Sequence, residues 1–255
     1  MPGLALACSG RSDVGRRPNN EDAWYASPRL AAVADGVGGA AAGEVASRMV
    51  IDALIHLDKC RLGAPLHEAL PEAVLRGNQA IGFIAECRPQ MMGMSTTVTA
   101  VALDDDDRYV VANIGDSRTY LLRDGALTQL TRDESLVQEL IDRGDLDAEA
   151  ARRHPQRSLV LRALDGDPDR RPALRALTAR PGDRLLLCSD GLSDSVDDDA
   201  IARALHGTSR GAATERLIGL ALAAGARDNV SVVVADAVPR AGAQLWARLA
   251  APSRA

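Results

Sequence analysis

Residues 96–125 read TTVTAVALDDDDRYVVANIGDSRTYLLRDG, and this stretch gives the clearest indication of the fold. Three apolar runs within it predict β-strands over residues 96–103, 109–114 and 119–122. Four consecutive aspartates follow the first run and an Asp-Gly pair follows the third, as is typical of hairpin turns. We interpret the four aspartates as a solvated turn rather than a metal site. Strands joined by such short turns pair antiparallel, so the stretch predicts an antiparallel sheet.

The rest of the chain shows two kinds of hydrophobic pattern. Further short apolar runs predict strands over residues 4–8, 31–34, 184–188 and 230–234. Apolar residues at helical spacing predict helices over residues 43–60, 68–87, 135–142, 148–153, 199–205 and 212–223. Blocks of helices inserted between antiparallel hairpins favour an α+β sandwich over an alternating α/β fold.

Composition excludes several classes of protein. The chain has 255 residues, 46% of them apolar, and a formal net charge of −5 without a basic stripe, which argues against a nucleic-acid partner. The four cysteines show no C-x-x-C spacing and are expected to be reduced. The N-terminus lacks the basic and long apolar regions of a signal peptide, and no apolar run approaches the length of a membrane span. We therefore expect a cytoplasmic protein without membrane contact.

Aspartates recur at the ends of the predicted strands, beside glycine, serine or asparagine. The motifs are Asn20-Glu21-Asp22, Asp35-Gly36, Gly115-Asp116-Ser117, Ser189-Asp190-Gly191 and Asp228-Asn229. One such pair alone is most often a turn. Five converging carboxylates would repel one another, and divalent cations would let them ionise together. Ligands that are all oxygen suit Mg²⁺, Mn²⁺ or Ca²⁺, whereas the His and Cys clusters of zinc sites do not occur in the sequence.

Taken in order, the motifs resemble those of the metal-dependent protein phosphatases of type 2C, in their bacterial form. The matching stretches are SDVGRRPNNED (12–22), VADGVGG (33–39), MSTT (94–97), NIGDSR (113–118), RDESLV (132–137), HPQR (154–157), CSDGLSD (188–194) and ARDNVS (226–231). They extend over residues 5–237, nearly the whole chain. Each stretch alone is a weak signal, but the ordered set is highly specific.

The resemblance implies an α+β fold with four layers, an α-β-β-α sandwich of two antiparallel sheets flanked by helical pairs. One phosphatase domain is expected over residues 1–240. Within it, residues 133–155 would form a flap beside the active site. Residues 241–255 are expected to form a short helix, over 244–249, and a tail.

The resemblance also assigns metal ligands. Asp35 would bridge two metal ions, Mn²⁺ or Mg²⁺, with the Gly36 carbonyl on one ion and with Asp190 and Asp228 on the other. Glu21 would act largely through metal-bound waters. A weaker third metal site is expected from Asp116, Asp190 and Asp194.

Two further residues are expected to serve the chemistry directly. Arg17 would hold the substrate phosphate. We align it with the family's arginine by its distance to residues 20–22, because the interval between Gly15 and Arg17 is one residue shorter than in the family pattern. Asp22 would act through a water, and it is our candidate to hold the water that protonates the leaving group. Eukaryotic members often carry a histidine, proposed as the general acid, at the position of Val37. Because valine cannot donate a proton, that role needs another residue in this chain.

Other departures concern positions near the site. Ala40 and Glu134 each replace a histidine common in bacterial members. His154 lies in the family-like HPQR stretch, where a structural role competes with that of a proton donor. None of these departures removes an expected metal ligand.

The function that the resemblance implies is hydrolysis of phosphoserine and phosphothreonine by water activated between two metal ions. Expected partners are phosphorylated proteins, including a bacterial serine/threonine kinase, and the default state is a monomer. The alternative is an inactive pseudophosphatase that binds phosphoproteins or a kinase. Because Asp35, Asp190 and Asp228 are all intact, that alternative is disfavoured. A stress-signalling phosphatase that acts on anti-sigma-factor antagonists is also disfavoured, since the chain has no sensory domain and its motifs are not weakened.

Overall fold

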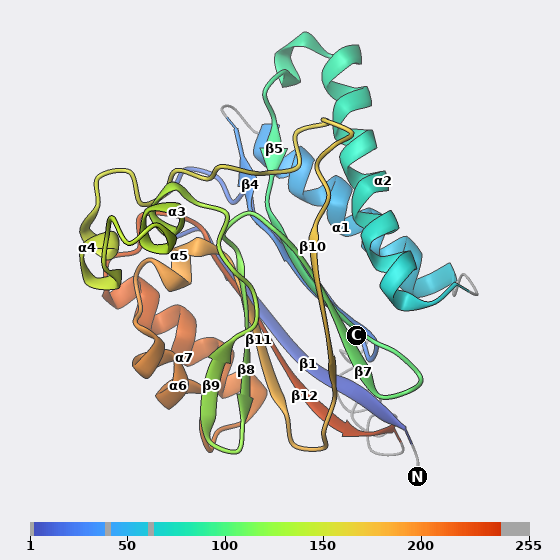
Figure 1. Cartoon of the computed structure of the whole chain (residues 1–255), viewed down its shortest axis with the longest axis vertical. Coiled ribbons are helices and arrows are strands. Elements are labelled where there is room, and N and C mark those ends of the chain that lie inside the picture. The colour runs from blue at the N-terminus through green and yellow to red at the C-terminus, as the bar shows by residue number, and fades with distance from the viewer. Residues whose placement is uncertain (1–2, 39–41, 61–63, 241–255) are drawn as a thin grey trace, which may run out of the picture.

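The computed structural model describes residues 3–38, 42–60 and 64–240. Two antiparallel sheets of five strands lie face to face (Figure 1). The first has the order β10-β7-β6-β3-β2, with β2 Ala23–Ala26, β3 Leu30–Ala34, β6 Val98–Leu103, β7 Arg108–Ile114 and β10 Ala173–Thr178. The second has the order β1-β12-β11-β8-β9, with β1 Leu4–Asp13, β8 Arg118–Arg123, β9 Ala126–Gln129, β11 Arg184–Cys188 and β12 Val230–Pro239. A short ladder joins β4 (Gly36–Val37) to β5 (Ser95–Thr96).

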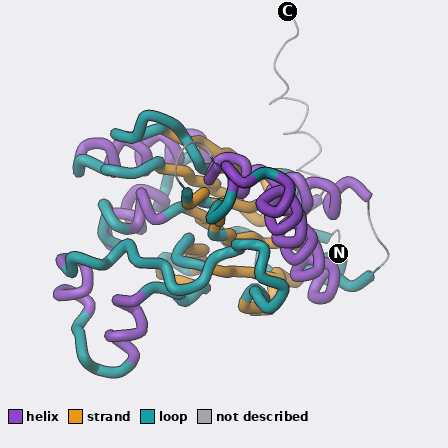
Figure 2. Tube along the Cα trace, turned by 90° about the horizontal axis from the view of Figure 1, so that it is seen from above, coloured by secondary structure: helices purple, strands orange, loops and turns teal. Residues whose placement is uncertain are grey.

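Helices cover the outer face of each sheet and complete the four predicted layers (Figure 2). The first sheet carries α1 (Ala42–Cys60) and α2 (Leu66–Cys87), and the second carries α6 (Asp198–Leu205) and α7 (Arg210–Ala223). The remaining helices are α3 (Leu136–Asp142), α4 (Ala148–Arg153), the single turn α5 (Asp190–Ser193) and a 3₁₀ turn, η1 (Pro89–Met91). None of the helices in the described ranges is both long and apolar enough to span a bilayer.

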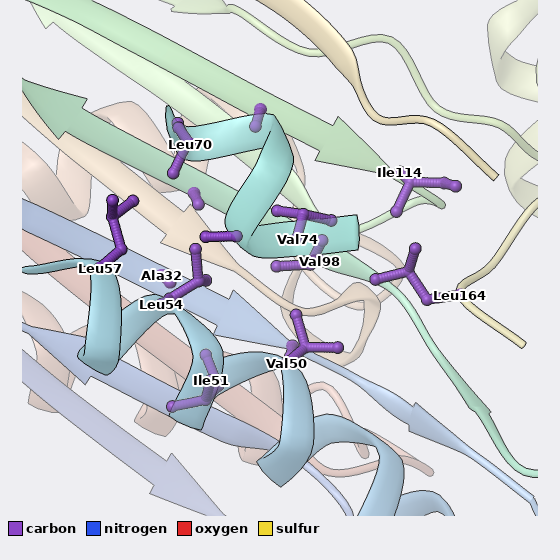
Figure 3. Packing of buried hydrophobic residues seen from close by; sticks show 14 of the residues in the cluster. Ala32, Val50, Ile51, Leu54, Leu57, Leu70, Val74, Val98, Ile114 and Leu164 are labelled. Carbon is purple, nitrogen blue, oxygen red and sulfur yellow. The ribbon is translucent and has the colours of Figure 1, made fainter. Parts of the chain in front are cut away.

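Three apolar clusters hold these layers together, and β3 belongs to two of them. Its residues alternate, so that Leu30 and Ala32 face α1 and α2 while Ala31 and Val33 face the other sheet. All five β3 residues are at most 2% exposed. Figure 3 shows side chains of α1 and α2 packing over Ala32 and its neighbours. Since β3 ends directly before Asp35, this double packing fixes the backbone that carries that carboxylate.

The four aspartates of residues 104–107 form the predicted turn between β6 and β7. Asp104 Oδ1 accepts hydrogen bonds from the backbone N–H of Asp106 at 3.0 Å and of Arg108 at 2.8 Å. In the next hairpin Asp124 and Gly125 both have positive φ, 53° and 82°, as a type I′ turn requires. The acidic run is therefore used for turn geometry.

Every strand and helix predicted within the described residues is present, but the strand expected over 96–103 is divided into β5 and β6, which belong to different sheets. Most bounds differ by a few residues: the helix expected over 68–87 begins at Leu66, and the strand over 230–234 continues to Pro239. The strands β2, β4, β9 and β10 were not predicted. The helix expected over 244–249 lies outside the described residues.

Candidate active site

Strand ends from both sheets surround a pocket of about 540 Å³. Asp35 follows β3, Asp116 follows β7, Asp190 follows β11, and Asp228 precedes β12. Seven of the nine predicted site residues line the pocket: Arg17, Glu21, Asp35, Gly36, Asp116, Asp190 and Asp228. In Figure 1 the labels β4 and α5 mark the elements that carry Gly36 and Asp190. The chain thus brings together residues more than 200 positions apart.

The other two predicted residues, Asp22 and Asp194, do not line this pocket. Asp22 Oδ2 accepts a hydrogen bond from Ser189 Oγ at 2.9 Å. Asp194 Oδ2 lies 3.4 Å from Arg157 Nε and accepts a hydrogen bond from Ser158 Oγ at 3.2 Å. A neighbouring cavity of about 200 Å³ is lined by all three carboxylates expected at the third metal site, Asp116, Asp190 and Asp194.

The carboxylates of this region have raised pKa values. Burial is the largest cause for Asp35 and Asp190, and neighbouring carboxylates raise the pKa of both further, well above the ordinary range. Burial also raises the pKa of Asp22 to about 6 and that of Asp116 to about 7. Close carboxylates in such surroundings must share protons or bind cations to stay together.

Two of these carboxylates have an oxygen that makes no hydrogen bond. Oδ1 of Asp190 and Oδ1 of Asp22 are buried and have no partner in the part of the chain that the structure describes. A buried oxygen without a partner is costly, and a cation would relieve that cost. Among the described residues, however, no three His, Cys, Asp or Glu side chains form a metal site by themselves. A cation here would also need oxygen ligands from backbone carbonyls or from water. Mg²⁺ in particular keeps several of its water ligands when it binds to proteins.

Arg17 is the cation that the chain itself supplies to the pocket. Its Nη2 donates to Asp228 Oδ2 at 2.7 Å, and this hydrogen bond is the main reason that the pKa of Arg17 is raised. The Arg17 side chain remains 56% exposed. It therefore keeps donors available for an anion that enters the pocket.

Asn229, which is 4% exposed, holds the loop that carries Arg17 and Glu21. Its Oδ1 accepts a hydrogen bond from the Glu21 N–H at 2.8 Å, and its Nδ2 donates to the carbonyls of Val14 and Asn19 at 2.9 Å each. Its own N–H donates to Asp228 Oδ1 at 2.9 Å. One uncharged side chain thus fixes the β1–β2 loop against the turn that carries Asp228.

The segment that carries Asp35 and Gly36 is held just as closely. Thr97 Oγ1 accepts a hydrogen bond from the Asp35 N–H at 3.2 Å, and the Asp35 carbonyl accepts from Thr97 N–H at 2.9 Å and Thr96 Oγ1 at 2.8 Å. The start of α1 approaches so closely that a Cβ on Gly36 would lie 2.2 Å from the Gly43 carbonyl oxygen. A larger residue at Gly36 would displace α1 from the site.

Sequence reasoning missed three residues that shape the site, namely Asn229, Ser189 and Thr97. Their only signal in the sequence is their position beside or opposite a predicted site aspartate. His154, by contrast, ends α4, where its Nδ1 accepts a hydrogen bond from the Gln156 N–H at 3.2 Å. It does not line the pocket.

Comparison with known proteins agrees with this geometry. The family model "Protein phosphatase 2C" matches residues 9–223. The chain belongs to this family. It is 52% identical over 236 residues to the serine/threonine protein phosphatase PstP of Mycobacterium tuberculosis, and 34% identical over 239 residues to the serine/threonine phosphatase stp of Listeria monocytogenes. The first alignment covers 92% of this chain and 46% of PstP, and the second covers 89% and 94%.

The fold of this protein phosphatase 2C domain is that of solved structures of the family. The catalytic domain of PstP, crystallised in complex with two manganese ions, superposes with a TM-score of 0.87 at 50% identity. The alignment covers 92% of this chain and 99% of that domain. The chain thus spans about half the length of full PstP and nearly all of its catalytic domain.

Proposed function

We propose that this chain is a protein phosphatase that hydrolyses phosphoserine and phosphothreonine with the help of two Mn²⁺ or Mg²⁺ ions. The observation that carries the proposal is the pocket in which Asp35 and Asp190, both with raised pKa, lie beside the exposed donors of Arg17. The relatives named as serine/threonine phosphatases support it, because they match nine tenths of this chain. The intact aspartates disfavour the alternative of an inactive pseudophosphatase.

We assign the two ions to Asp35, the Gly36 carbonyl, Asp190 and Asp228, and a weaker third ion to Asp116, Asp190 and Asp194. The unpartnered Oδ1 of Asp190 supports this assignment. When bound, the ions supply a water activated as nucleophile and neutralise charge on the phosphate. Glu21, whose N–H is held by Asn229, would reach the ions through waters.

Arg17 is assigned to bind and orient the phosphoryl group. Its planar fork matches phosphate oxygens and keeps its charge at every working pH. Asp228 holds one side of that fork, so the guanidinium is oriented before substrate arrives. This preorganisation reduces the entropy lost when the phosphate binds.

We assign protonation of the leaving oxygen to a water held by Asp22. No histidine occurs among the described residues that line the pocket. Asp22 has a buried Oδ1 without a hydrogen-bond partner among the described residues, so this oxygen is free to hold a water. Ser189 orients this carboxyl group through its hydrogen bond to Oδ2.

The surrounding assignments are also proposals. Residues 133–155, which include α3 and α4, are the proposed flap beside the site within a domain over residues 1–240. The proposed partners are phosphorylated proteins, including a serine/threonine kinase, and the proposed state is a monomer.

The test is hydrolysis of a phosphothreonine peptide with and without Mn²⁺ by the wild type and by Asp190→Asn. We expect turnover that requires the metal and falls at least about a hundredfold in the variant. Asp199→Asn, an exposed aspartate on α6, is the control and should be fully active. A folded wild type that is inactive with every divalent ion would refute the proposal in favour of binding alone.

A further inference from the structure

Next to the aspartate pocket lies a second groove of about 520 Å³. The two cavities share Arg17, Ser158, Asp190 and Asp228, so the groove continues from the place where the phosphate is proposed to bind. The loop between α7 and β12 contributes Ala224, Gly225, Arg227 and Asp228 to its lining. A peptide whose phosphorylated residue lies in the pocket could place its neighbouring residues in this groove.

The groove contains arginines of two kinds. Two already have a carboxylate partner, because Arg17 pairs with Asp228 at 2.7 Å and Arg157 pairs with Asp194 at 3.4 Å. Arg227 also lines the groove, but it is exposed and makes no hydrogen bond or ion pair within the described part of the chain. It therefore brings an uncompensated positive charge to the lining of the groove.

A second uncompensated arginine lies beside this loop. Arg16 is exposed and likewise has no hydrogen bond or ion pair among the residues described. Its guanidinium lies across Gly225, a residue of the groove lining, where a Cβ would be 3.3 Å from Arg16 Nη2. Gly225 thus leaves room for Arg16 on the same loop that carries Arg227. We call these two residues the Arg16–Arg227 subsite.

The charge of the subsite is opposite to that of the chain. The protein carries a formal charge of −5. Of the three aspartates that line the groove, Asp194 and Asp228 have arginine partners, and Asp190 also lines the aspartate pocket. Two exposed guanidinium groups that have no ion-pair partner among the described residues attract anions, and each can bind a carboxylate or a phosphate through two N–H donors.

We propose that the Arg16–Arg227 subsite binds a second anionic group of the phosphoprotein substrate, close in sequence to the phosphorylated residue. This inference rests on the proposed phosphatase function and specifies its substrate class. The second anion is either an acidic side chain or another phosphate, which share the same recognition chemistry. Because the subsite lies outside the aspartate pocket, it adds binding affinity for the substrate and leaves the chemical step unchanged.

The test compares three phosphothreonine peptides that differ only in their flanking residues. One has neutral flanks, one has glutamates on both sides, and one carries a second phosphothreonine. Initial rates with Mn²⁺ at fixed ionic strength would be measured for the wild type, for Arg227→Gln, and for the double variant Arg16→Gln with Arg227→Gln. A small aryl phosphate serves as a substrate that cannot reach the subsite.

We expect the wild type to have a KM about 5- to 20-fold lower for one or both anionic peptides than for the neutral peptide. The double variant should lose this preference, Arg227→Gln should lose part of it, and both should keep the wild-type kcat and aryl phosphate turnover. Preference for the doubly phosphorylated peptide alone would identify phosphate as the second anion. Equal preference for the glutamate peptide would show that a carboxylate suffices.

The control is a double variant with the same loss of charge elsewhere, Arg203→Gln with Arg216→Gln. Both arginines are exposed on α6 and α7, and neither lines the pockets described above. Equal KM values for all three peptides in the wild type, or an undiminished preference in the subsite variant, would overturn the proposal.

Failure of the phosphatase assignment can be distinguished from failure of the subsite. If no phosphate ester is hydrolysed, the phosphatase assignment fails. The Kd values of the labelled peptides, measured by fluorescence anisotropy with Mn²⁺, then test the subsite without any turnover. Tighter binding of an anionic peptide that the double variant loses would support the subsite, and equal Kd values for all three peptides would overturn it.

Discussion

The side chain of Asn229 makes three hydrogen bonds to backbone groups of the loop that carries Arg17 and Glu21. The sequence predicted the site aspartates from their charge and their position at strand ends, and most of these carboxylates line the pocket. Nothing in the sequence, however, indicated which uncharged neighbour would position them. Asn229, Ser189 and Thr97 act through hydrogen bonds to segments far away along the chain, and such partners become visible only when the fold is known.

We expect Asn229→Ala to lose about 2–4 kcal/mol of unfolding free energy, because the three backbone groups would be left without their partner. Its phosphatase activity should fall as well, since Glu21 and Arg17 would no longer be held. Asn229→Asp keeps the acceptor for the Glu21 N–H but places a buried carboxylate oxygen against the Val14 and Asn19 carbonyls, so it should destabilise at least as much as alanine. Urea unfolding measures the effect. A fully stable alanine variant would contradict the role given to this side chain.

The raised pKa values of Asp22 and Asp116, about 6 and 7, predict how the metal-free protein responds to pH. Each carboxyl group binds its proton more tightly in the folded than in the unfolded chain. Stability from these groups is therefore fully present below about pH 4 and is lost as pH rises toward 7. We expect the unfolding free energy in EDTA to fall between pH 5 and pH 8 by at least about 2 kcal/mol.

The control for this pH dependence is Asp116→Asn, in which one of the titrating groups is removed. Its unfolding free energy in EDTA should depend less steeply on pH than that of the wild type. Addition of Mn²⁺ should flatten the wild-type curve, because the cation replaces the proton. Stability that rises from pH 5 to pH 8 without metal would show that other groups dominate.

At the scale of whole elements, sequence patterns did not predict three of the four edge strands of the large sheets, β2, β9 and β10. β10 is exposed along nearly its whole length, including Leu174 at 49%. A strand with no buried face lacks the alternation on which prediction depends, and β10 is defined by its pairing with β7. The central strands β3, β6 and β11 were predicted because burial on both faces imposes a continuous apolar run.

The segment that includes α3 and α4 is fastened to the strands by Glu134. Its Oε2 accepts a hydrogen bond from the Gly115 N–H at 3.1 Å, next to Asp116, and its Oε1 accepts one from Arg162 Nη1 at 3.0 Å. This residue replaces the histidine common in bacterial members of the family. The replacement thus joins the proposed flap to the β7–β8 turn through a carboxylate that is only 14% exposed.

We expect Glu134→Ala to release this segment without unfolding the sandwich. Amide hydrogen exchange within residues 136–153 should become at least about tenfold faster, because local opening needs less free energy. The melting temperature should change by only a few degrees. Glu149→Ala removes an exposed ion pair on α4 and serves as the control. Exchange rates that match the wild type would show that Glu134 does not restrain the segment.

At the scale of the molecule, the site exists only where both sheets meet. Its residues come from the loop after β1, from the ends of β3, β7 and β11, and from the turn before β12. The sequence motifs predicted which carboxylates would gather. They could not predict that Asp22 does not line the pocket, because its position depends on its hydrogen bond with Ser189 and on the course of β2.

Because only the folded chain assembles these ligands, metal should stabilise the whole molecule. Binding at a hundred times Kd adds about 2.7 kcal/mol. For a chain of this size that corresponds to a rise in melting temperature of roughly 5–10 °C. Differential scanning fluorimetry with millimolar Mn²⁺, and again after EDTA, measures it. Asp190→Asn should respond much less, and an unchanged wild-type melting temperature would refute the convergent metal site.

The packing of β3 determines which segments of the proposed phosphatase can accept substitutions during evolution. Substitutions in β3 disturb the helical layer from one side of the strand and the opposite sheet from the other, so this strand should tolerate almost no mutation. Arg16 and Arg227 project from loops into solvent and support no apolar cluster. The substrate preference proposed for these two arginines can therefore change through substitutions in the loops. Asp35 meanwhile keeps its place at the end of an unaltered strand.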